Sequence, residues 1–259
     1  MTELAFYQPA ITLPKGVKAF VTTRSGGFSK GPWQSFNLGG HVQDDPAAVA
    51  ANRDLLRTQL LSAIGGSSLD LQWLNQVHGT TVYHALEQLT EPPPQADALY
   101  TTRTNLACGV LTADCLPVVF CSSDGKEVAI AHAGWRGLQK GVLENTLASF
   151  KAPAAQIMAW LGPAIGPCHF EVGSEVREAF LAVASAEAMV ATEAAFLPSS
   201  QQGKWFADLY KLARIRLLAA GLSIVSGEPA CTFCNSTTWY SYRQNPVTGR
   251  FATLIVRTS

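Results

Sequence analysis

The chain has 259 residues, of which 47% are hydrophobic and 15% charged, so it is long and apolar enough to bury a full core. Nineteen basic and nineteen acidic residues give a formal net charge of zero, which excludes an overall field attracting nucleic acid or an anionic membrane. The N-terminus lacks the pattern of a signal peptide, and no apolar run approaches the roughly 18 residues of a spanning helix. We therefore expect a cytoplasmic monomer whose six cysteines are mostly reduced thiols.

The first half of the sequence alternates strand-like and helix-like segments. A strand is predicted at 18–24, before a polar, glycine-rich loop. The pattern DPAAVAANRDLLRTQLL predicts a helix over 45–61, with Asp45 as its N-cap. Short strands are expected at 71–79 and 80–86. The proline-rich connection that follows, TEPPPQ, is too short to separate domains.

The second half contains the segments richest in strand-forming residues. Strands are predicted at 106–122, 127–135, 156–162 and 251–258, and helices at 136–150, 173–184 and 206–221. Helices and strands occur without strict alternation of one strand and one helix. This order favours the α+β class, as a layered α/β sandwich with mixed β-sheets, in a single domain over residues 1–259.

Three potential metal ligands end apolar segments in similar settings. His78 in NQVHG and His132 in IAHAGWRG each precede a glycine-rich turn. Cys115 lies just before Pro117, which cannot donate a hydrogen bond to a sheet ladder. One thiolate and two imidazoles leave a fourth tetrahedral position for water or substrate, as in catalytic zinc sites. The alternative is that each is an ordinary core residue, because the three are far apart and lack zinc-finger spacing.

Sequence blocks along nearly the whole chain carry a family resemblance. In order, they are TTRSGGFS, FNLGGHVQDDP, NR, QVHG, ADALYTT, LTADCLPV, AHAGWRG, LGPAIGPCHFEVG, CTFC, SYR and TGR. Together they resemble the YfiH/YlmD-like family. Members of that family have been labelled polyphenol oxidoreductase or laccase, and have been described as purine nucleoside phosphorylases with adenosine deaminase activity.

The resemblance implies a fold, a metal and an activity. It implies a single-domain layered sandwich in which His78, Cys115 and His132 hold one zinc ion, with copper as the alternative metal. It also implies phosphorolysis of adenosine, inosine, guanosine or S-methyl-5'-thioadenosine to the base and ribose 1-phosphate, with zinc-dependent adenosine deamination in the same pocket. Purine nucleosides and phosphate are therefore the expected partners. Cys115 and His132 are then catalytic residues as well as ligands.

Two acidic residues have open roles. Asp114 precedes Cys115 and is expected to point the opposite way along the strand pleat, as a catalytic or a structural carboxylate. Glu171 lies in GPCHFEVG, a turn entering a helix, where a carboxylate either handles protons or favours the helix start.

A phosphorolytic enzyme must also hold phosphate beside the nucleoside. Arg136 lies where GWRG enters a helix, so its guanidinium and the unpaired backbone N–H groups there suit an anion. Arg24 and Arg243 lie beside polar loops, and Asn37 lies in the block FNLGGHVQDDP. All four are predicted to bind phosphate or substrate. The alternative for each arginine is a helix cap or a surface ion pair.

The histidines of this chain are too few and too widely spaced for the several copper ions of a multicopper laccase. A multicopper oxidase takes most of its ligands from closely paired histidines, and this chain has five histidines and no His-x-His. A polyphenol oxidase with a single copper remains open.

Three alternatives compete with the predicted catalytic metal centre. His169, followed by Cys231 and Cys234, resembles the zinc-deaminase signature, but Ala230 interrupts that pattern, so a structural role is favoured for the cysteine pair; Cys168 has no assigned role. A thiol hydrolase with Cys115 as nucleophile and His132 as base is another alternative. The family resemblance implies peptidoglycan precursors as the substrate of such a hydrolase, because members of that family are implicated in editing them. A protein whose zinc only stabilises the fold is a third.

Overall fold

The computed structural model describes residues 6–87 and 89–258. The strands are β1 (Val17–Val21), β2 (Asp70–Gln72), β3 (Val82–His84), β4 (Ala98–Thr101), β5 (Leu106–Thr112), β6 (Leu116–Ser122), β7 (Val128–Ala133), β8 (Ile157–Leu161), β9 (Glu171–Gly173), β10 (Phe196–Pro198), β11 (Lys204–Ala207), β12 (Ile224–Ser226) and β13 (Phe251–Arg257). The helices are α1 (Pro46–Ile64), α2 (Trp135–Lys140), α3 (Val142–Ala148), α4 (Ser174–Leu181), α5 (Met189–Glu193) and α6 (Leu209–Ala219), with 3-10 turns at Gly31–Trp33 and Ala154–Gln156. Within these residues no helix combines the length and the hydropathy needed to cross a bilayer.

The strands form three sheets. A four-stranded sheet has the order β1-β13-β5-β2 and is antiparallel except for the parallel pair β2 and β5. A six-stranded sheet has the order β12-β8-β6-β7-β4-β3, with parallel pairs at its two edges and antiparallel pairs between them. A small antiparallel sheet has the order β10-β11-β9. The predicted α+β class with mixed sheets is confirmed.

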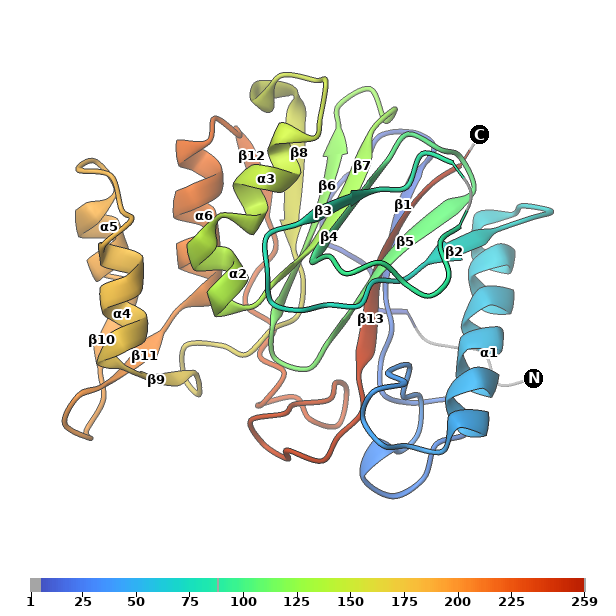
Figure 1. The fold of residues 1–259 in the computed structure, drawn as a ribbon, viewed down its shortest axis with the longest axis horizontal. Helices are drawn as coiled ribbons and strands as arrows, with labels where there is room; N and C mark the ends of the chain where they lie inside the picture. The colour runs from blue at the N-terminus through green and yellow to red at the C-terminus, as the bar shows by residue number, and fades with distance from the viewer. Residues whose placement is uncertain (1–5, 88, 259) are drawn as a thin grey trace.

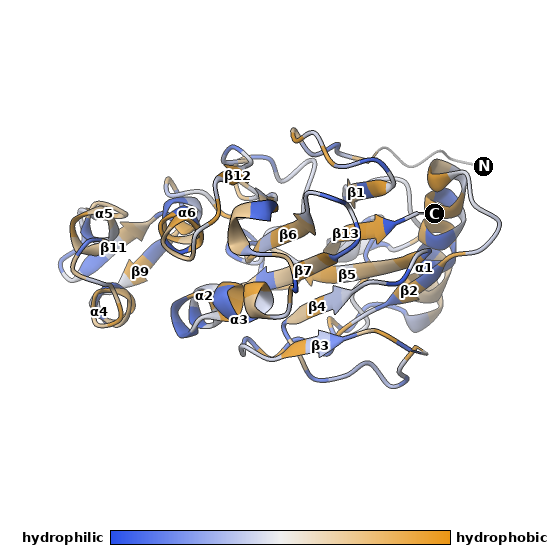
Figure 2. Cartoon of the chain, turned by 90° about the horizontal axis from the view of Figure 1, so that it is seen from above, coloured by the Kyte–Doolittle hydropathy of each residue, from blue (hydrophilic) through white to orange (hydrophobic). Residues whose placement is uncertain are grey.

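The elements lie in layers (Figure 1, Figure 2). Helix α1 packs on the outer face of the four-stranded sheet. The inner face of that sheet packs against the six-stranded sheet, and the other face of the larger sheet is covered by α2, α3 and α6. The small sheet, with α4 and α5, lies at the end of the molecule farthest from α1. This order explains why the central strands are apolar on both faces.

Strand β6 contributes side chains to two hydrophobic cores, one on each of its faces. Val118 and Phe120 belong to the core under the helices, whereas Val119 and Cys121 belong to the core between the sheets. Alternate side chains of a strand point to opposite faces, so a strand buried on both faces is a continuous apolar run. The run LPVVFCS meets that requirement, and β5 and β7 follow the same rule.

Helix α1 confirms its predicted start. The Asp45 carboxylate accepts a hydrogen bond from the backbone N–H of Ala47 at 3.0 Å, and Pro46 occupies the first turn. The helix ends at Ile64, one turn later than predicted, where Gly65 takes a left-handed conformation with φ of 69°.

Other predicted elements are wrong in extent. The strand predicted over 71–79 is limited to β2, and the strand predicted over 106–122 is divided into β5 and β6 by the bend at 113–115. The helix expected over 136–150 is divided into α2 and α3 because Gly141, with φ of 100°, ends one helix and begins the next. The start of the helix expected over 206–221 belongs to β11, and Asp208 caps α6 by accepting from the backbone N–H of Lys211.

Candidate metal centre and active-site pocket

A cavity of about 540 Å³ opens where the ends of the two large sheets meet the loop that connects β12 to β13, here called the C-terminal loop. Its wall includes the loop after β2, the connection between β5 and β6, the end of β7 and the start of α2. The apolar part of the wall contains Leu74, Trp135, Ile165 and Phe170. The volume falls in the range of small-molecule sites.

Three side chains from separate segments meet in this cavity. His78, Cys115 and His132 place one ligand atom each within 4.8 Å of the others. The Cys115 sulfur lies 3.8 Å from His78 Nε2, and the two imidazole rings meet edge to face with centroids 4.8 Å apart. The structure therefore brings together the three residues that the sequence singled out.

The backbone matches the expected strand end for one histidine and not for the other. His132 lies at the end of β7 as predicted, whereas His78 lies in a loop with a left-handed φ of 59°. Asp114 also has a positive φ, of 93°, in the bend between β5 and β6. The expectation that a strand pleat separates Asp114 from Cys115 is wrong, because the bend sends the two side chains apart.

Asp97, which sequence reasoning missed, holds the centre together. Its fully buried carboxylate accepts hydrogen bonds from the backbone N–H groups of His78 at 2.9 Å and Gly79 at 2.6 Å. It also contacts Nδ1 of His132 at 2.9 Å. A proton on Nδ1 leaves Nε2 of that ring as a ligand atom. The available signal was a carboxylate inside ADALYTT, at the start of a buried strand.

The cluster favours a thiolate beside an imidazolium. Burial raises the pKa of the Cys115 thiol, but the His132 charge and hydrogen bonds with both histidines outweigh it and lower that pKa to about 6. Burial lowers the pKa of His132, yet the Cys115 thiolate and the Asp97 carboxylate raise it to about 9. An anionic sulfur is the form that binds metal.

The donor set fits a tetrahedral divalent ion. Zinc–sulfur bonds of about 2.3 Å and zinc–nitrogen bonds of about 2.0 Å place sulfur and nitrogen about 3.6 Å apart on a tetrahedron. The separation of 3.8 Å between Cys115 and His78 matches that edge. The Asp97 carboxylate accepts a hydrogen bond from Nδ1 of His132, whose other nitrogen faces the cluster, and a contact of this kind is the usual support of a metal-bound imidazole.

Asp114 lines the cavity but is already hydrogen-bonded. One carboxylate oxygen accepts from the Thr232 hydroxyl at 2.6 Å, and the other accepts from the Arg243 backbone N–H at 2.7 Å. Asp114 therefore fastens the C-terminal loop to the bend that carries Cys115.

Of the predicted arginines, Arg136 and Arg243 line the cavity. The Arg136 guanidinium lies 4.5 Å from the centre of the Trp135 ring and donates no hydrogen bond to any described residue. The Arg243 guanidinium instead donates to the backbone carbonyls of His169 at 3.3 Å and Glu171 at 2.9 Å. Arg136 is thus the more available cation.

Three other predicted residues lie outside this cavity wall. Arg24 donates to the carbonyls of Gln34 and Ser236. Asn37 is fully buried, and its side-chain oxygen accepts from the Arg250 backbone N–H at 2.8 Å. These contacts support loop structure, and the structure does not bring these two side chains to the metal-ligand cluster.

Glu171 is the third. Its carboxylate accepts from the Ser199 hydroxyl at 2.6 Å, beside the small sheet, and its side chain is not in the cavity wall. It lies in strand β9 rather than at the start of a helix, and α4 begins at Ser174.

Sequence reasoning missed three further residues of the wall. His41, Tyr242 and Arg250 reach the cavity from loops. Burial and the charge of nearby arginines lower the pKa of His41. Each residue lies in a block that carries the family resemblance, FNLGGHVQDDP, SYR or TGR, and membership of such a block was the available signal.

Comparison with known proteins identifies the family of this chain. A family model described as multi-copper polyphenol oxidoreductase laccase matches residues 18–258. A Pseudomonas aeruginosa protein named purine nucleoside phosphorylase is 49% identical over 253 residues, covering 97% of this chain and 98% of that protein. The Escherichia coli protein named purine nucleoside phosphorylase YfiH is 47% identical, covering 93% and 94%. The crystal structure of Neisseria meningitidis NMB0706 is 43% identical, covers 98% of this chain and 99% of that one, and superposes with a TM-score of 0.88. The chain therefore belongs to the YfiH-like family, which carries the polyphenol oxidoreductase laccase description.

Proposed function

We propose that this protein is a purine nucleoside phosphorylase that also deaminates adenosine. The observation that carries the proposal is that one cavity joins the His78, Cys115 and His132 cluster to the guanidinium of Arg136, which donates no hydrogen bond within the described part of the chain. Relatives that are 49% and 47% identical over nearly the whole chain carry the phosphorylase name. Adenosine, inosine, guanosine and S-methyl-5'-thioadenosine are the substrates to test.

The apolar wall suits the base and the sugar. Leu74, Ile165 and Phe170 offer contacts to an uncharged purine, and the cavity volume of about 540 Å³ has room for a nucleoside together with phosphate. Burying a purine there would remove water from both ring faces, which strengthens the polar contacts at the cavity floor.

Arg136 is the proposed phosphate-binding residue. Its guanidinium can form two parallel hydrogen bonds with a phosphate. Held in this way, phosphate would attack C1′ of the ribose while the bond to the purine nitrogen breaks, and the base would leave with the bonding electrons. Stacking on Trp135 would limit the movement of the guanidinium.

His78, Cys115 and His132 would hold zinc, with copper as the alternative. When bound, the ion would supply a Lewis acid that polarises oxygen and lowers the pKa of water, which is the chemistry that deamination of adenosine needs. Asp97 would keep the proton on Nδ1 of His132 and so keep Nε2 directed at the cluster.

A nucleoside panel tests the proposal. Metal-loaded protein is incubated with each nucleoside, with and without phosphate, and the products are separated by chromatography. Phosphate-dependent release of free base and ribose 1-phosphate is expected, together with phosphate-independent conversion of adenosine to inosine. Folded, metal-loaded protein that turns over none of these nucleosides would refute the proposal. Oxidation of a phenol by copper-loaded protein in the same panel would favour the oxidase alternative.

The variant Arg136→Ala should impair phosphorolysis and leave adenosine deamination largely unchanged. Phosphate KM should rise on the order of tenfold to a hundredfold, because the charge-assisted bonds to phosphate are worth about 1.5–3 kcal/mol. Deamination does not use phosphate and should change little. Arg177→Ala is the matched control, because Arg177 makes the same kind of stacking contact, 4.5 Å from the Trp205 ring, outside the cavity. Equal loss of both activities in Arg136→Ala would count against a phosphate-binding role.

A further inference from the structure

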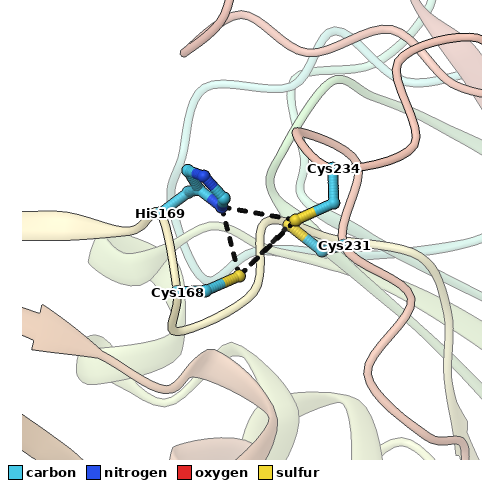
Figure 3. Close-up of side chains that lie close together, drawn as sticks. All are labelled: Cys168, His169, Cys231 and Cys234. Carbon is cyan, nitrogen blue, oxygen red and sulfur yellow. Dashed lines mark hydrogen bonds between the residues drawn. The ribbon is translucent and has the colours of Figure 1, made fainter.

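A second cluster of soft ligands lies outside the cavity wall. Cys168, His169, Cys231 and Cys234 each place one ligand atom within 4.8 Å of all the others. Figure 3 shows the three sulfur atoms and the imidazole directed toward one another. The cysteines are free thiols. The set contains three sulfurs and one nitrogen, which is a ligand set of structural zinc sites.

The four residues come from two loops held together by backbone pairing. Cys168 and His169 lie between β8 and β9, and Cys231 and Cys234 follow β12 (Figure 3). Ala164 pairs with Cys231 in a parallel bridge, and the Thr232 N–H donates to the Ala164 carbonyl at 3.0 Å. The cluster is thus assembled by tertiary structure from donors more than 60 positions apart.

The interatomic distances agree with a tetrahedron around one ion. Two sulfurs bound to one zinc lie about 3.8 Å apart, and a sulfur and a nitrogen lie about 3.6 Å apart. The Cys168 sulfur lies 3.6 Å from that of Cys234 and 3.9 Å from that of Cys231. His169 Nδ1 lies 3.1 Å from the Cys168 sulfur and 3.4 Å from the Cys234 sulfur.

A disulfide does not account for this arrangement. It would bring two sulfurs to about 2.0 Å and leave the third sulfur and the imidazole without a role. Here Cys168 has two sulfur neighbours at nearly equal separations, 3.6 and 3.9 Å. Four donor atoms that all lie within 4.8 Å of one another, with no pair at bonding distance among the separations of 3.1–3.9 Å, are the pattern expected for ligands of a common ion.

Surrounding contacts orient the donors. The Gly166 N–H donates to the Cys231 sulfur at 3.2 Å, a contact typical of a metal-bound thiolate. The His169 ring stacks on Phe233 with centroids 4.0 Å apart and planes 17° apart, which fixes the ring. A side chain at Gly166 would meet the Cys231 Cβ at 3.1 Å, so the close approach depends on glycine.

We propose that Cys168, His169, Cys231 and Cys234 form a second, structural zinc site. Four protein donors complete a tetrahedron and leave no position for water or substrate, and three thiolates favour zinc over harder ions. The ion would tie the loop after β8 to the loop after β12. The second of these loops carries Arg243, whose guanidinium donates to the His169 carbonyl. The site does not depend on the proposed nucleoside chemistry.

Metal content of matched variants tests the site. Wild-type protein purified under reducing conditions should contain about two zinc ions per chain. Cys231→Ser with Cys234→Ser should lose one and keep the other, and His78→Ala should show the reverse. His169→Cys, which offers four thiolates, should keep both. Cys121→Ala, which changes a buried thiol in the core between the sheets, is the control and should also keep both.

Two measurements keep the test decisive if the double serine variant fails to fold. X-ray absorption of the wild type should show an average of about two sulfur ligands per zinc, because one site offers one sulfur and the other offers three. Cobalt bound to His78→Ala should show intense thiolate-to-metal absorption. A single zinc with about one sulfur, removed by His78→Ala, would overturn the proposal. A disulfide among these cysteines in the reduced preparation, or copper at the site, would also overturn it.

Discussion

The two clusters of this chain use similar side chains in different proportions and places. His78, Cys115 and His132 supply two nitrogens and one sulfur in the wall of a cavity. The other cluster, defined by Cys168, His169, Cys231 and Cys234, supplies three sulfurs and one nitrogen on two loops. The first set, the three-donor cluster, leaves a tetrahedral position free, whereas the second set, the four-donor cluster, leaves none. Donor number therefore separates a centre suited to chemistry from one suited to holding loops.

The clusters are also physically connected. Asp114 precedes Cys115 and accepts a hydrogen bond from Thr232, which follows Cys231. The other oxygen of the same carboxylate binds the Arg243 N–H. Arg243 also donates to the His169 carbonyl. The loop that carries Thr232 and Arg243 is therefore hydrogen-bonded both to the bend beside Cys115 and to a residue of the other cluster. An ion in the four-donor cluster would thus stabilise one wall of the cavity without touching a substrate.

The largest expected effect comes from removing a ligand of the three-donor cluster. His78→Ala should lose one metal ion per chain and reduce turnover on the order of a thousandfold or more, because a metal supplies several kcal/mol of transition-state stabilisation. Metal analysis and a nucleoside assay of the same sample measure both effects.

His84→Ala is the matched control for this prediction. His84 lies in β3, and its imidazole contacts the Ser149 hydroxyl at 3.0 Å, away from both clusters. It should keep full metal content and activity. Undiminished turnover by His78→Ala after loss of its metal would break the link between the three-donor cluster and catalysis.

A chelator should remove metal from the two clusters at different rates. An ion with an open position lets a chelator bind before any protein ligand leaves, whereas a closed set of four does not. A chromogenic chelator should therefore remove one equivalent first, with activity falling in step, and a second equivalent more slowly. Cys234→Ser should lack the slow phase. Activity that falls with the slow phase would contradict the assignment of roles.

Parts of this structure were predictable because their causes are local. The start of α1 follows from Asp45 and Pro46, whose capping geometry needs no tertiary contact. The apolar runs of β5 to β7 follow from burial on two faces. The break between α2 and α3 was missed because the helical pattern continues across Gly141, and only the left-handed φ of that residue divides it.

The sites were less predictable because their residues meet through distant pairing. His78, Cys115 and His132 converge from three segments, and the residues alone suggested this without deciding it. Asp97 was missed because a carboxylate buried beneath a loop has no periodic signal. The spacing of Cys231 and Cys234 is only half of a ligand set, and the other half comes from a loop more than 60 positions earlier.

A smaller effect is expected from Asp97→Asn. The amide is similar in size but uncharged, so it holds the His132 ring and the His78 loop less firmly. Metal affinity at the three-donor cluster should fall about 10- to 100-fold. Competition titration with a chelator measures the change.

The four-donor cluster serves as the internal reference for that experiment. Its affinity should be unchanged in Asp97→Asn, and Asp124→Asn, in the exposed turn after β6, should affect neither cluster. Equal weakening of both clusters would mean that Asp97 acts through global stability rather than through His132.

The smallest expected effects come from adding one carbon atom beside each cluster. Gly134 has φ of −60° and ψ of 155°, which alanine also adopts, but a Cβ there would lie 3.0 Å from the Cys115 sulfur and 3.1 Å from His78 Cδ2. A Cβ at Gly166 would lie 3.3 Å from the Cys231 sulfur. Crowding of this kind costs about 1–3 kcal/mol, and contacts of 3.0–3.3 Å are relieved by a small shift of the neighbouring atoms, so affinity should fall by about fivefold, the lower end of that range, at the nearer cluster only. Gly134→Ala should thus weaken the metal that supports activity, and Gly166→Ala should weaken the slowly released metal. If either variant weakened both, the clusters would be one coupled unit, and the Asp114 to Thr232 contact would be the first place to look for the coupling.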